Sequence, residues 1–309
     1  MISRRNIRIK VFQTIFEAGM QEDSPDVKKL HSSLDHKFEQ SHALFASCCH
    51  LNYLVAEYVL IYAQQKASKH LPTSADLSIS TKLSGNLVLQ KLKCNSSFNK
   101  IVKDHHIHLL FENEWIRQLF SQIIDTPEYV RYTADPNRKM EDEIEILNHI
   151  SRIALLENED SCQFMADKYI NRYSDAEMIY QWFPLLWSRP ENFSFTKLLS
   201  ADKSEFAHEL LSAYYDKKEY VFSLIEPNLM NWDADRVAVI DLILLHLGVC
   251  EMLYFESIPL KVSINEYIDI AKSYSTPQSG QFVNGLLDNV RKQLADQNKL
   301  TKTDYVKKK

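Results

Sequence analysis

An all-α fold is the class that the sequence predicts, and three observations favour it. The chain has 309 residues but only 5 glycines, so few glycine-built turns and no glycine-rich phosphate loops are expected. Apolar residues recur at helical spacing along most of the chain. We find no convincing set of alternating apolar and polar segments and no repeat of fixed period. The length allows one large domain or two ordinary ones, and 45% apolar residues are enough for a core.

The first helix is expected to begin near Ser3, which is a suitable N-cap, and to extend to residue 18. Its apolar row consists of Ile7, Val11 and Ile15. Arg4 and Arg8 are spaced one turn apart, and Arg5 lies close by. The helix can therefore bury one side and present guanidinium groups on the other, and the planar fork of arginine suits phosphate. A solvated basic face without a ligand is the alternative interpretation.

The middle of the chain predicts a series of helices separated by polar connections. Residues 20–40 are polar and indicate a loop that leads into a long helix over residues 36–71. Further helices are expected over residues 87–92, 101–124, 140–156, 161–173 and 176–187. Polar connections are expected over residues 72–86 and 133–139. Residues 188–196, which contain Arg189-Pro190, indicate a domain boundary.

The helical pattern becomes more regular after residue 198 and predicts helices over residues 205–215, 218–229 and 237–253. Further on, Ser263 followed by Glu266 predicts a capping box at a helix start. Thr276-Pro277 predicts the start of the next helix. The apolar face of that helix consists of Phe282, Leu286 and Val290. Gly285 lies within the same helix at a cost of about 1 kcal/mol relative to alanine, which indicates a close neighbour.

The net charge of −5 is unevenly distributed along the chain. Residues 1–19 carry four basic side chains against one acidic one, and the tail from residue 291 carries seven against two. Because both ends are basic, the middle is acidic, and any contact with nucleic acid is confined to a patch where the termini meet. A lysine-rich tail that only aids solubility is the alternative.

Neither a catalytic motif nor a cofactor motif is present in the sequence. We find no GxSxG, HExxH, P-loop or GxGxxG pattern, so we expect no enzyme and no cofactor. His105 and His108 are the best metal candidates, with His42 or Glu112 as further ligands, but no zinc spacing is recognised and we expect no metal site. Five cysteines without a CxxC pair predict a reducing interior. With no secretory signal and no adequate membrane-spanning run, we expect a cytoplasmic protein.

Several segments occur in the order that is typical of one family. They are RRNIRIKVFQTIFEA, FAHELLSA, WDADRVAVIDLILLHLGVCEM, IPLKVSINEYIDIAKSYS and FVNGLLD. Together they resemble the NusB family of transcription antitermination factors, and the resemblance covers residues 1–18 and about 198–292. It implies a NusB-like helical bundle that is interrupted by a large helical insertion over residues 19–197. Residues 293–309 are then expected to form a flexible basic tail.

The resemblance also implies a function and a set of site residues. NusB proteins bind boxA-type single-stranded RNA of nascent ribosomal RNA transcripts together with NusE, a small-subunit ribosomal protein. The complex joins RNA polymerase and suppresses premature termination of transcription. The residues that the resemblance assigns to RNA binding are Arg4, Arg5, Arg8, Gln278, Gln281 and Phe282. Those that it assigns to NusE docking are Trp232, Arg236 and Asp241.

The sequence departs from the family pattern at several positions. His246 stands at the usual arginine and Cys250 at the usual tyrosine, and Gln278 and Gln281 stand where some members have charged residues. Two other hypotheses therefore remain open. One is an interaction scaffold in which the acidic insertion has displaced RNA binding. The other is part of a ribosomal RNA cytosine methyltransferase, although the sequence lacks the glycine-rich cofactor-binding domain of such an enzyme.

Overall fold

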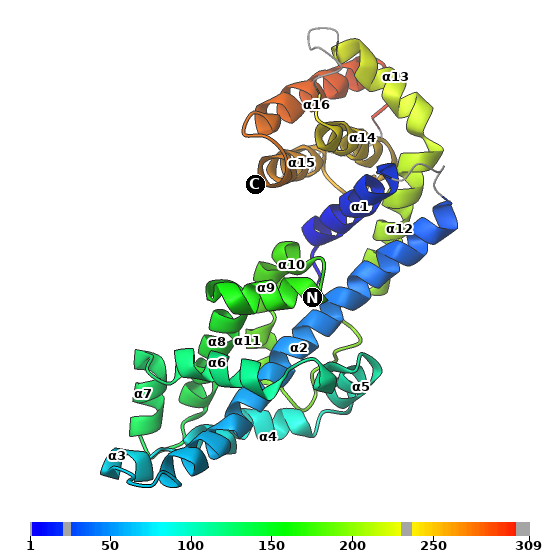
Figure 1. Ribbon diagram of the computed structural model, residues 1–309. Helices are drawn as coiled ribbons and strands as arrows, with labels where there is room; N and C mark the ends of the chain where they lie inside the picture. The colour runs from blue at the N-terminus through cyan, green and yellow to red at the C-terminus, as the bar shows by residue number, and fades with distance from the viewer. Residues whose placement is uncertain (1, 21–25, 230–236, 301–309) are drawn as a thin grey trace, which may run out of the picture. The chain divides into compact units, whose positions relative to one another are not determined.

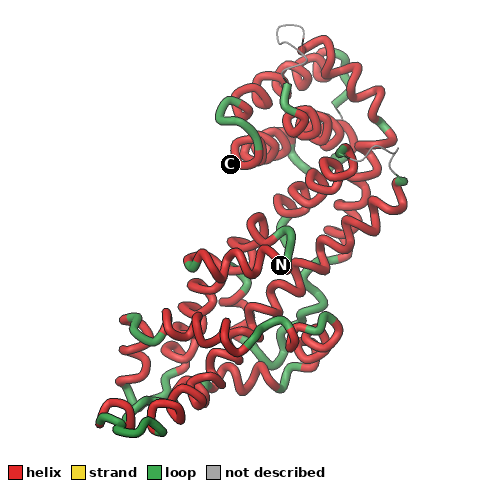
Figure 2. Tube along the Cα trace, viewed as in Figure 1, coloured by secondary structure: helices red, strands yellow, loops and turns green. Residues whose placement is uncertain are grey.

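The computed structural model describes residues 2–20, 26–229 and 237–300. Within these ranges the regular elements are all helices, which confirms the predicted all-α class (Figure 2). The chain divides into two compact units. We call residues 2–36 together with the chain from residue 200 onward the core unit, and residues 37–199 the inserted unit.

These units differ from the predicted division at both ends of the insertion. The inserted unit begins at residue 37 rather than 19, because the first turns of the long helix α2 (Val27–Ala67) belong to the core unit. It ends at residue 199, two residues beyond the predicted end. The predicted tail from residue 293 starts inside the last helix, α16 (Ser279–Asp296), and residues 301–309 lie outside the described ranges.

The core unit is built around one helix that is buried on nearly all sides. Besides the first turns of α2, its helices are α1 (Arg4–Gly19), α12 (Ala201–Asp216), α13 (Lys218–Leu229), α14 (Val239–Tyr254), α15 (Leu260–Tyr274) and α16. Helix α14 packs against α1, α12, α13, α15 and α16 (Figure 1). Every residue of α14 from Ile243 to Met252 is buried, as expected for a helix that is apolar all round.

The inserted unit holds a cluster of aromatic side chains against α2. Besides the rest of α2, its elements are α3 (Ser74–Leu77), η1 (Lys82–Gly85), α4 (Leu87–Lys93), α5 (Ser96–Asp104), η2 (Ile107–Leu109), α6 (Asn113–Ile123), α7 (Pro127–Ala134), α8 (Met140–Arg152), η3 (Ile153–Glu157), α9 (Glu159–Lys168), α10 (Arg172–Tyr180) and α11 (Phe183–Ser188). The ring of Phe45 in α2 is fully buried. Its centroid lies 5.3 Å from those of Trp182, Phe183 and Phe195. This cluster lies in the core of the unit.

Helix α2 is, within the described ranges, the one helix that is long and apolar enough to cross a membrane. In its most apolar 18-residue window, 67% of the residues are buried inside the protein. Burial of this kind is equally typical of the core helix of a soluble protein, so α2 is weak support for a membrane span.

The helices of the insertion differ from the predicted ones in three places. The expected helix over residues 101–124 is two helices, α5 and α6, because His106 has a left-handed backbone with φ of 51° that ends helical continuity. The break between α9 and α10 falls at residues 169–171, earlier than expected. Helix α7 was not predicted, although Thr126 caps it and Pro127 stands in its first turn.

The predicted capping box at Ser263 is wrong. Helix α15 begins at Leu260 after Pro259, so Ser263 lies inside the helix rather than at its start. The buried hydroxyl of Ser263 instead donates a hydrogen bond of 2.7 Å to Glu251 Oε1 in α14. The Ser-x-x-Glu pattern is shared by capped helix starts and by interior turns that face a neighbour, so the pattern by itself does not separate them. The next helix, α16, likewise begins at Ser279, two residues beyond Pro277.

Of Gly248 and Gly285, it is Gly248 that lies close to neighbouring helices. No atom outside its own helix lies within 4 Å of the position that a Cβ on Gly285 would occupy, so the predicted close neighbour is absent. A Cβ on Gly248 would lie 2.9 Å from Leu287 Cδ2 and 3.4 Å from Tyr267 Cδ2. Gly248 therefore lets α14 approach α15 and α16 closely.

These two glycines make opposite predictions for stability. Gly285→Ala should stabilise the protein by roughly 0.5–1 kcal/mol, because an exposed helical site gains alanine's propensity without a clash. Gly248→Ala should destabilise it by about 1–2 kcal/mol, because overpacking against Leu287 outweighs the same propensity gain. Urea unfolding of both variants measures the difference. Equal shifts in the same direction would contradict this assignment of the close contact.

Candidate nucleic-acid interface

The start of α1 carries two accessible arginines at the positive end of a helix. Ser3 is the N-cap as predicted, and its hydroxyl accepts the backbone N–H of Asn6 at 3.2 Å. Arg4 and Arg5 are therefore the first two helical residues, and the first turn contains no acidic side chain. The guanidinium charges and the helix dipole both attract anions at this point.

Neither arginine is held in a strong pair. Arg5 Nη1 lies 3.6 Å from Asp269 Oδ2, with both side chains about half exposed. Exposed pairs of this kind contribute about 0–1 kcal/mol. The Arg4 guanidinium lies 5.7 Å from the centre of the Phe206 ring. Both side chains can therefore leave these contacts for a phosphate group at low cost.

Arg8 does not share this surface, and the prediction that it does is wrong. Its side chain is 2% exposed, and Nε and Nη2 donate to the two carboxylate oxygens of Glu251 at 2.8 and 2.7 Å. Nη1 lies 3.6 Å from Glu266 Oε2. A guanidinium that is enclosed and bidentately paired cannot reach a phosphate group without opening the core.

The carboxylate of Glu251 accepts hydrogen bonds from three side chains. Besides Arg8, it accepts the hydroxyl of Ser263 at 2.7 Å and that of Tyr267 at 3.1 Å. Burial acts to lower the pKa of the Arg8 guanidinium, but the hydrogen bonds and charge of Glu251 outweigh this and raise it. Burial and the charge of Glu251 raise the pKa of Tyr267 well above its usual range, so its hydroxyl remains a donor. We call Arg8, Glu251, Ser263 and Tyr267 the buried arginine network.

A second buried carboxylate fixes the turn before α16. Asp241 in the first turn of α14 is 5% exposed, and its Oδ2 accepts the hydroxyl of Ser279 at 2.6 Å. The Ser279 oxygen in turn accepts the backbone N–H of Thr276 at 3.2 Å. The prediction that Asp241 docks NusE on an exposed face is therefore wrong. Its carboxylate faces inward and holds the start of α16.

Of the predicted residues in this turn, two are exposed and one is not. Gln278 and Gln281 are exposed, so their amides are accessible to a ligand. Phe282 is only 9% exposed and belongs to the core. A base cannot stack on an aromatic face that is already covered by the protein, so Phe282 is an error among the predicted RNA contacts. Trp232 and Arg236, predicted to dock NusE, lie outside the described residues.

Helix α15 connects the two exposed sets. Asp269 pairs with Arg5 and also with Lys272, whose Nζ lies 3.2 Å from Asp269 Oδ1. The Lys272 side chain in turn lies against Gly280, where a Cβ would be 2.7 Å from Lys272 Cγ. Sequence reasoning missed Asp269 and Lys272 as site residues. Their spacing of three predicts that they share one face of a helix, but it does not indicate which neighbouring helix that face contacts. We call Arg4, Arg5, Lys272, Gln278 and Gln281 the candidate RNA surface.

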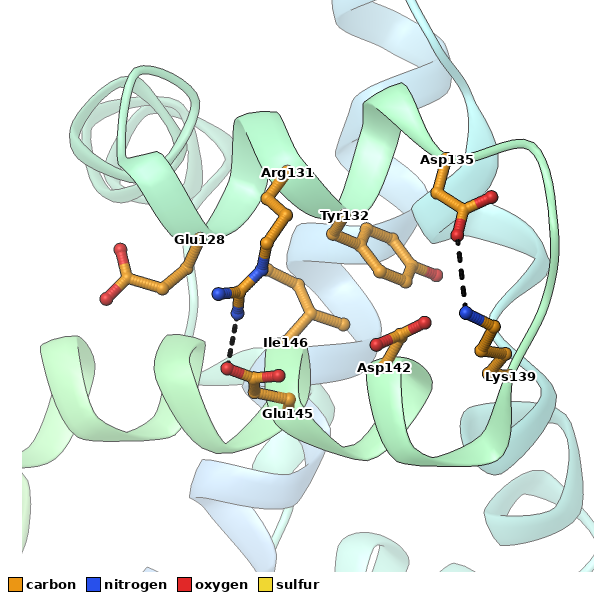
Figure 3. A pocket seen from close by; sticks show the side chains of 8 residues that line it. All are labelled: Glu128, Arg131, Tyr132, Asp135, Lys139, Asp142, Glu145 and Ile146. Carbon is orange, nitrogen blue, oxygen red and sulfur yellow. Dashed lines mark hydrogen bonds and ion pairs between the residues drawn. The ribbon is translucent and has the colours of Figure 1, made fainter.

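Two cavities of the inserted unit are lined by charged side chains or histidines. One cavity of about 240 Å³ lies between α7 and α8 (Figure 3). Arg131 pairs there with Glu145 and Lys139 pairs with Asp135, and Glu128 and Asp142 add two further carboxylates to the lining. His105 and His42 line another cavity with Asp104, but no group of three ligands suited to a metal ion occurs among the described residues.

Comparison with known proteins gives the family. The NusB family profile matches residues 171–292, which begin before the predicted boundary and include α10 and α11. The transcription antitermination protein NusB of Salinibacter ruber is 44% identical over 99 residues, which are 32% of this chain and 62% of that protein. The proteins of the same name from Bacillus mycoides and Methylacidiphilum infernorum are 39% and 44% identical over 90 and 122 residues. These matches cover 29% and 38% of this chain, and 69% and 85% of the two relatives.

No solved structure matches the chain. Because the match to the Methylacidiphilum infernorum protein extends over 85% of that relative at 44% identity, the chain belongs to the NusB family.

Proposed function

We propose that the protein is a transcription antitermination factor that binds boxA-type single-stranded RNA of nascent ribosomal RNA transcripts together with NusE, within the RNA polymerase antitermination complex. Membership of the NusB family supports antitermination. The observation that carries the RNA contact is the exposed arginine pair at the positive end of α1, connected through α15 to the exposed glutamines of the α16 start.

Each part of the candidate RNA surface has a distinct task in this proposal. Arg4, Arg5 and Lys272 contact phosphate groups, which gives affinity that decreases as salt increases. Gln278 and Gln281 carry amides that donate to and accept from base edges, which gives sequence preference. Asp241 keeps the turn in place through Ser279 without touching the RNA. No step in this proposal is catalytic.

Removing the arginine pair is the direct test. Arg4→Ala combined with Arg5→Ala should weaken binding of boxA-type RNA roughly tenfold at moderate salt, because two phosphate contacts are lost. The slope of log K against log salt should become shallower by about 1.4, which is roughly 0.7 for each contact with a single strand. Fluorescence anisotropy with labelled RNA, with and without NusE, measures both values.

The matched control removes two charges elsewhere on the core unit. Lys217 and Lys218 are exposed, and their double alanine variant changes the net charge equally. An equal loss of affinity in both double variants would mean that only the net charge matters, and it would contradict the assignment of Arg4 and Arg5 as RNA contacts. Arg8→Ala is not suitable here, because it removes a partner of the buried Glu251 and acts on folding.

A protein-interaction scaffold without RNA binding is the second candidate. The observation that favours it is the burial of Arg8 and Phe282, two of the six predicted RNA contacts. In that case NusE would be captured by the full-length protein with the same affinity in the presence and absence of boxA-type RNA. Stronger capture with RNA favours the antitermination factor.

A further inference from the structure

The inserted unit carries a run of sequence with lysines and no carboxylates, within a chain that is acidic overall. Residues 78–103 contain five lysines and neither aspartate nor glutamate, against a net charge of −5 for the whole chain. Lys82 is engaged, since its Nζ donates to the carbonyl oxygens of Tyr132 and Asp135 at 2.9 and 2.8 Å. The other four are exposed on α4 and α5: Lys91, Lys93, Lys100 and Lys103. We call these four residues the lysine patch.

The lysine patch is not neutralised by ion pairs. Elsewhere in the described chain, lysines pair with carboxylates, as Lys69 does with Asp76 and Lys292 with Asp288. Within the same ranges no member of the patch lies in such a pair. Lys93 Nζ donates a hydrogen bond of 3.1 Å to the Tyr53 hydroxyl, and Glu57 attracts its charge only from beyond ion-pair distance.

Two acidic residues lie near one member of the patch. Lys100 lines an open cavity that also contains Glu39 and Asp104, so its charge is partly balanced there. Even with these neighbours, four unpaired ammonium groups on two adjoining helices leave a local excess of positive charge.

The two helices that carry the patch are rigidly fixed. Buried Asn86 caps α4 by accepting the backbone N–H groups of Val88 and Leu89 at 3.0 and 3.1 Å. Buried Asn95 caps α5 and donates to the carbonyl oxygens of Pro190 and Phe193. Since α4 and α5 are in contact (Figure 1), the four lysines lie on two adjoining helices whose positions are fixed.

The composition of this surface favours RNA over a protein or a membrane. The apolar side chains of α4 and α5 face inward: Val88, Leu89, Leu92, Phe98 and Ile101 are buried. A membrane-surface helix requires an exposed apolar face, which is lacking here. Protein interfaces are depleted in lysine, whereas lysines beside an accessible aromatic ring such as Tyr53 suit phosphates and bases.

We infer that the lysine patch of the inserted unit is a second RNA-binding surface, which contacts the phosphate backbone of RNA without base specificity. This surface lies in a different unit from the candidate RNA surface. It does not depend on boxA recognition, so it remains testable if the proposed function fails. It gives the insertion a role in holding a transcript beyond the short element that the core unit is proposed to read.

The test uses the full-length protein and two RNAs, one boxA-type and one of scrambled sequence. The patch variant changes Lys91, Lys93, Lys100 and Lys103 to glutamine. The control variant changes Lys66, Lys69, Lys139 and Lys168, which lie elsewhere in the same unit, to glutamine, with the same change in net charge. The patch variant should bind both RNAs at least tenfold more weakly at low salt, with a salt slope shallower by about 0.7 for each lost contact. The control variant should retain both values.

The outcomes separate the two proposals. Loss of binding to both RNAs in the patch variant supports the second surface, whatever the Arg4 and Arg5 variant does to boxA preference. Equal binding by patch and control variants overturns the inference. Tighter binding of the wild type to anionic phosphatidylserine vesicles than to either RNA, lost in the patch variant, also overturns it in favour of a membrane. Unchanged thermal unfolding of the patch variant establishes that any loss of binding is local.

Discussion

Glu251→Ala should destabilise the core unit by about 3–5 kcal/mol, because it removes the bidentate partner of the buried Arg8 guanidinium and leaves only Glu266 at 3.6 Å. The same substitution leaves the hydroxyls of Ser263 and Tyr267 without their acceptor. Each unsatisfied buried donor adds to the cost. Urea unfolding followed by far-ultraviolet circular dichroism measures the loss.

The control for this prediction removes both charges together. Arg8→Met combined with Glu251→Leu should recover the part of the loss that comes from the buried charge, since well-packed apolar residues often replace a buried ion pair at little cost, while the hydroxyls of Ser263 and Tyr267 still lack their acceptor. The double variant therefore separates the penalty of an orphaned charge from the net contribution of the pair. A loss below 1 kcal/mol for Glu251→Ala would contradict the buried arginine network. Arg8→Ala should resemble Glu251→Ala.

Phe45→Ala should destabilise the inserted unit by about 3–5 kcal/mol. The ring is fully buried and has four aromatic neighbours, Trp182, Phe183, Phe193 and Phe195, so its removal leaves a cavity that these large rings cannot fill. Three of the chain's four tryptophans lie in the inserted unit at positions 115, 182 and 187. Tryptophan fluorescence in urea therefore follows mainly this unit.

An exposed phenylalanine provides the comparison. Phe222 in α13 is 43% exposed, and Phe222→Ala should change stability by no more than about 0.5 kcal/mol. If Phe45→Ala costs no more than Phe222→Ala, the aromatic cluster does not support the unit. If the two units unfold separately, circular dichroism should show two transitions, of which Phe45→Ala shifts the one that fluorescence reports.

The first helix illustrates how far sequence reasoning reaches. The Ser3 cap, the helix start and the apolar rows follow from local chemistry and were predicted correctly. Which arginine is buried and which is exposed could not be predicted, because Arg4 and Arg8 are one turn apart and share a face by periodicity alone. Helix α14 brings Glu251 to Arg8 and leaves Arg4 exposed. A contact across 243 residues has no local signature in one sequence.

The same limit explains the other errors. Ser263 has the pattern of a cap, but its hydroxyl faces Glu251 because α15 starts one turn earlier. Gly285 lies mid-helix, where a close helix–helix contact was expected, but the glycine that makes such a contact is Gly248. Asp241 and Phe282 have residue types suited to binding, but both are buried in the core unit.

By itself the sequence determined the helical class, most helix positions, the resemblance to the NusB family and the basic start of the chain. These depend on periodicity, caps and composition, which act over a few residues. Tertiary structure alone decided which charges are enclosed and which are accessible. That choice depends on which helix supplies the partner, as α14 does for Arg8 and α15 for Arg5. Burial of a charge is favourable only where such a partner is present, so the same residue type became a structural element at position 8 and a candidate ligand-binding residue at position 4.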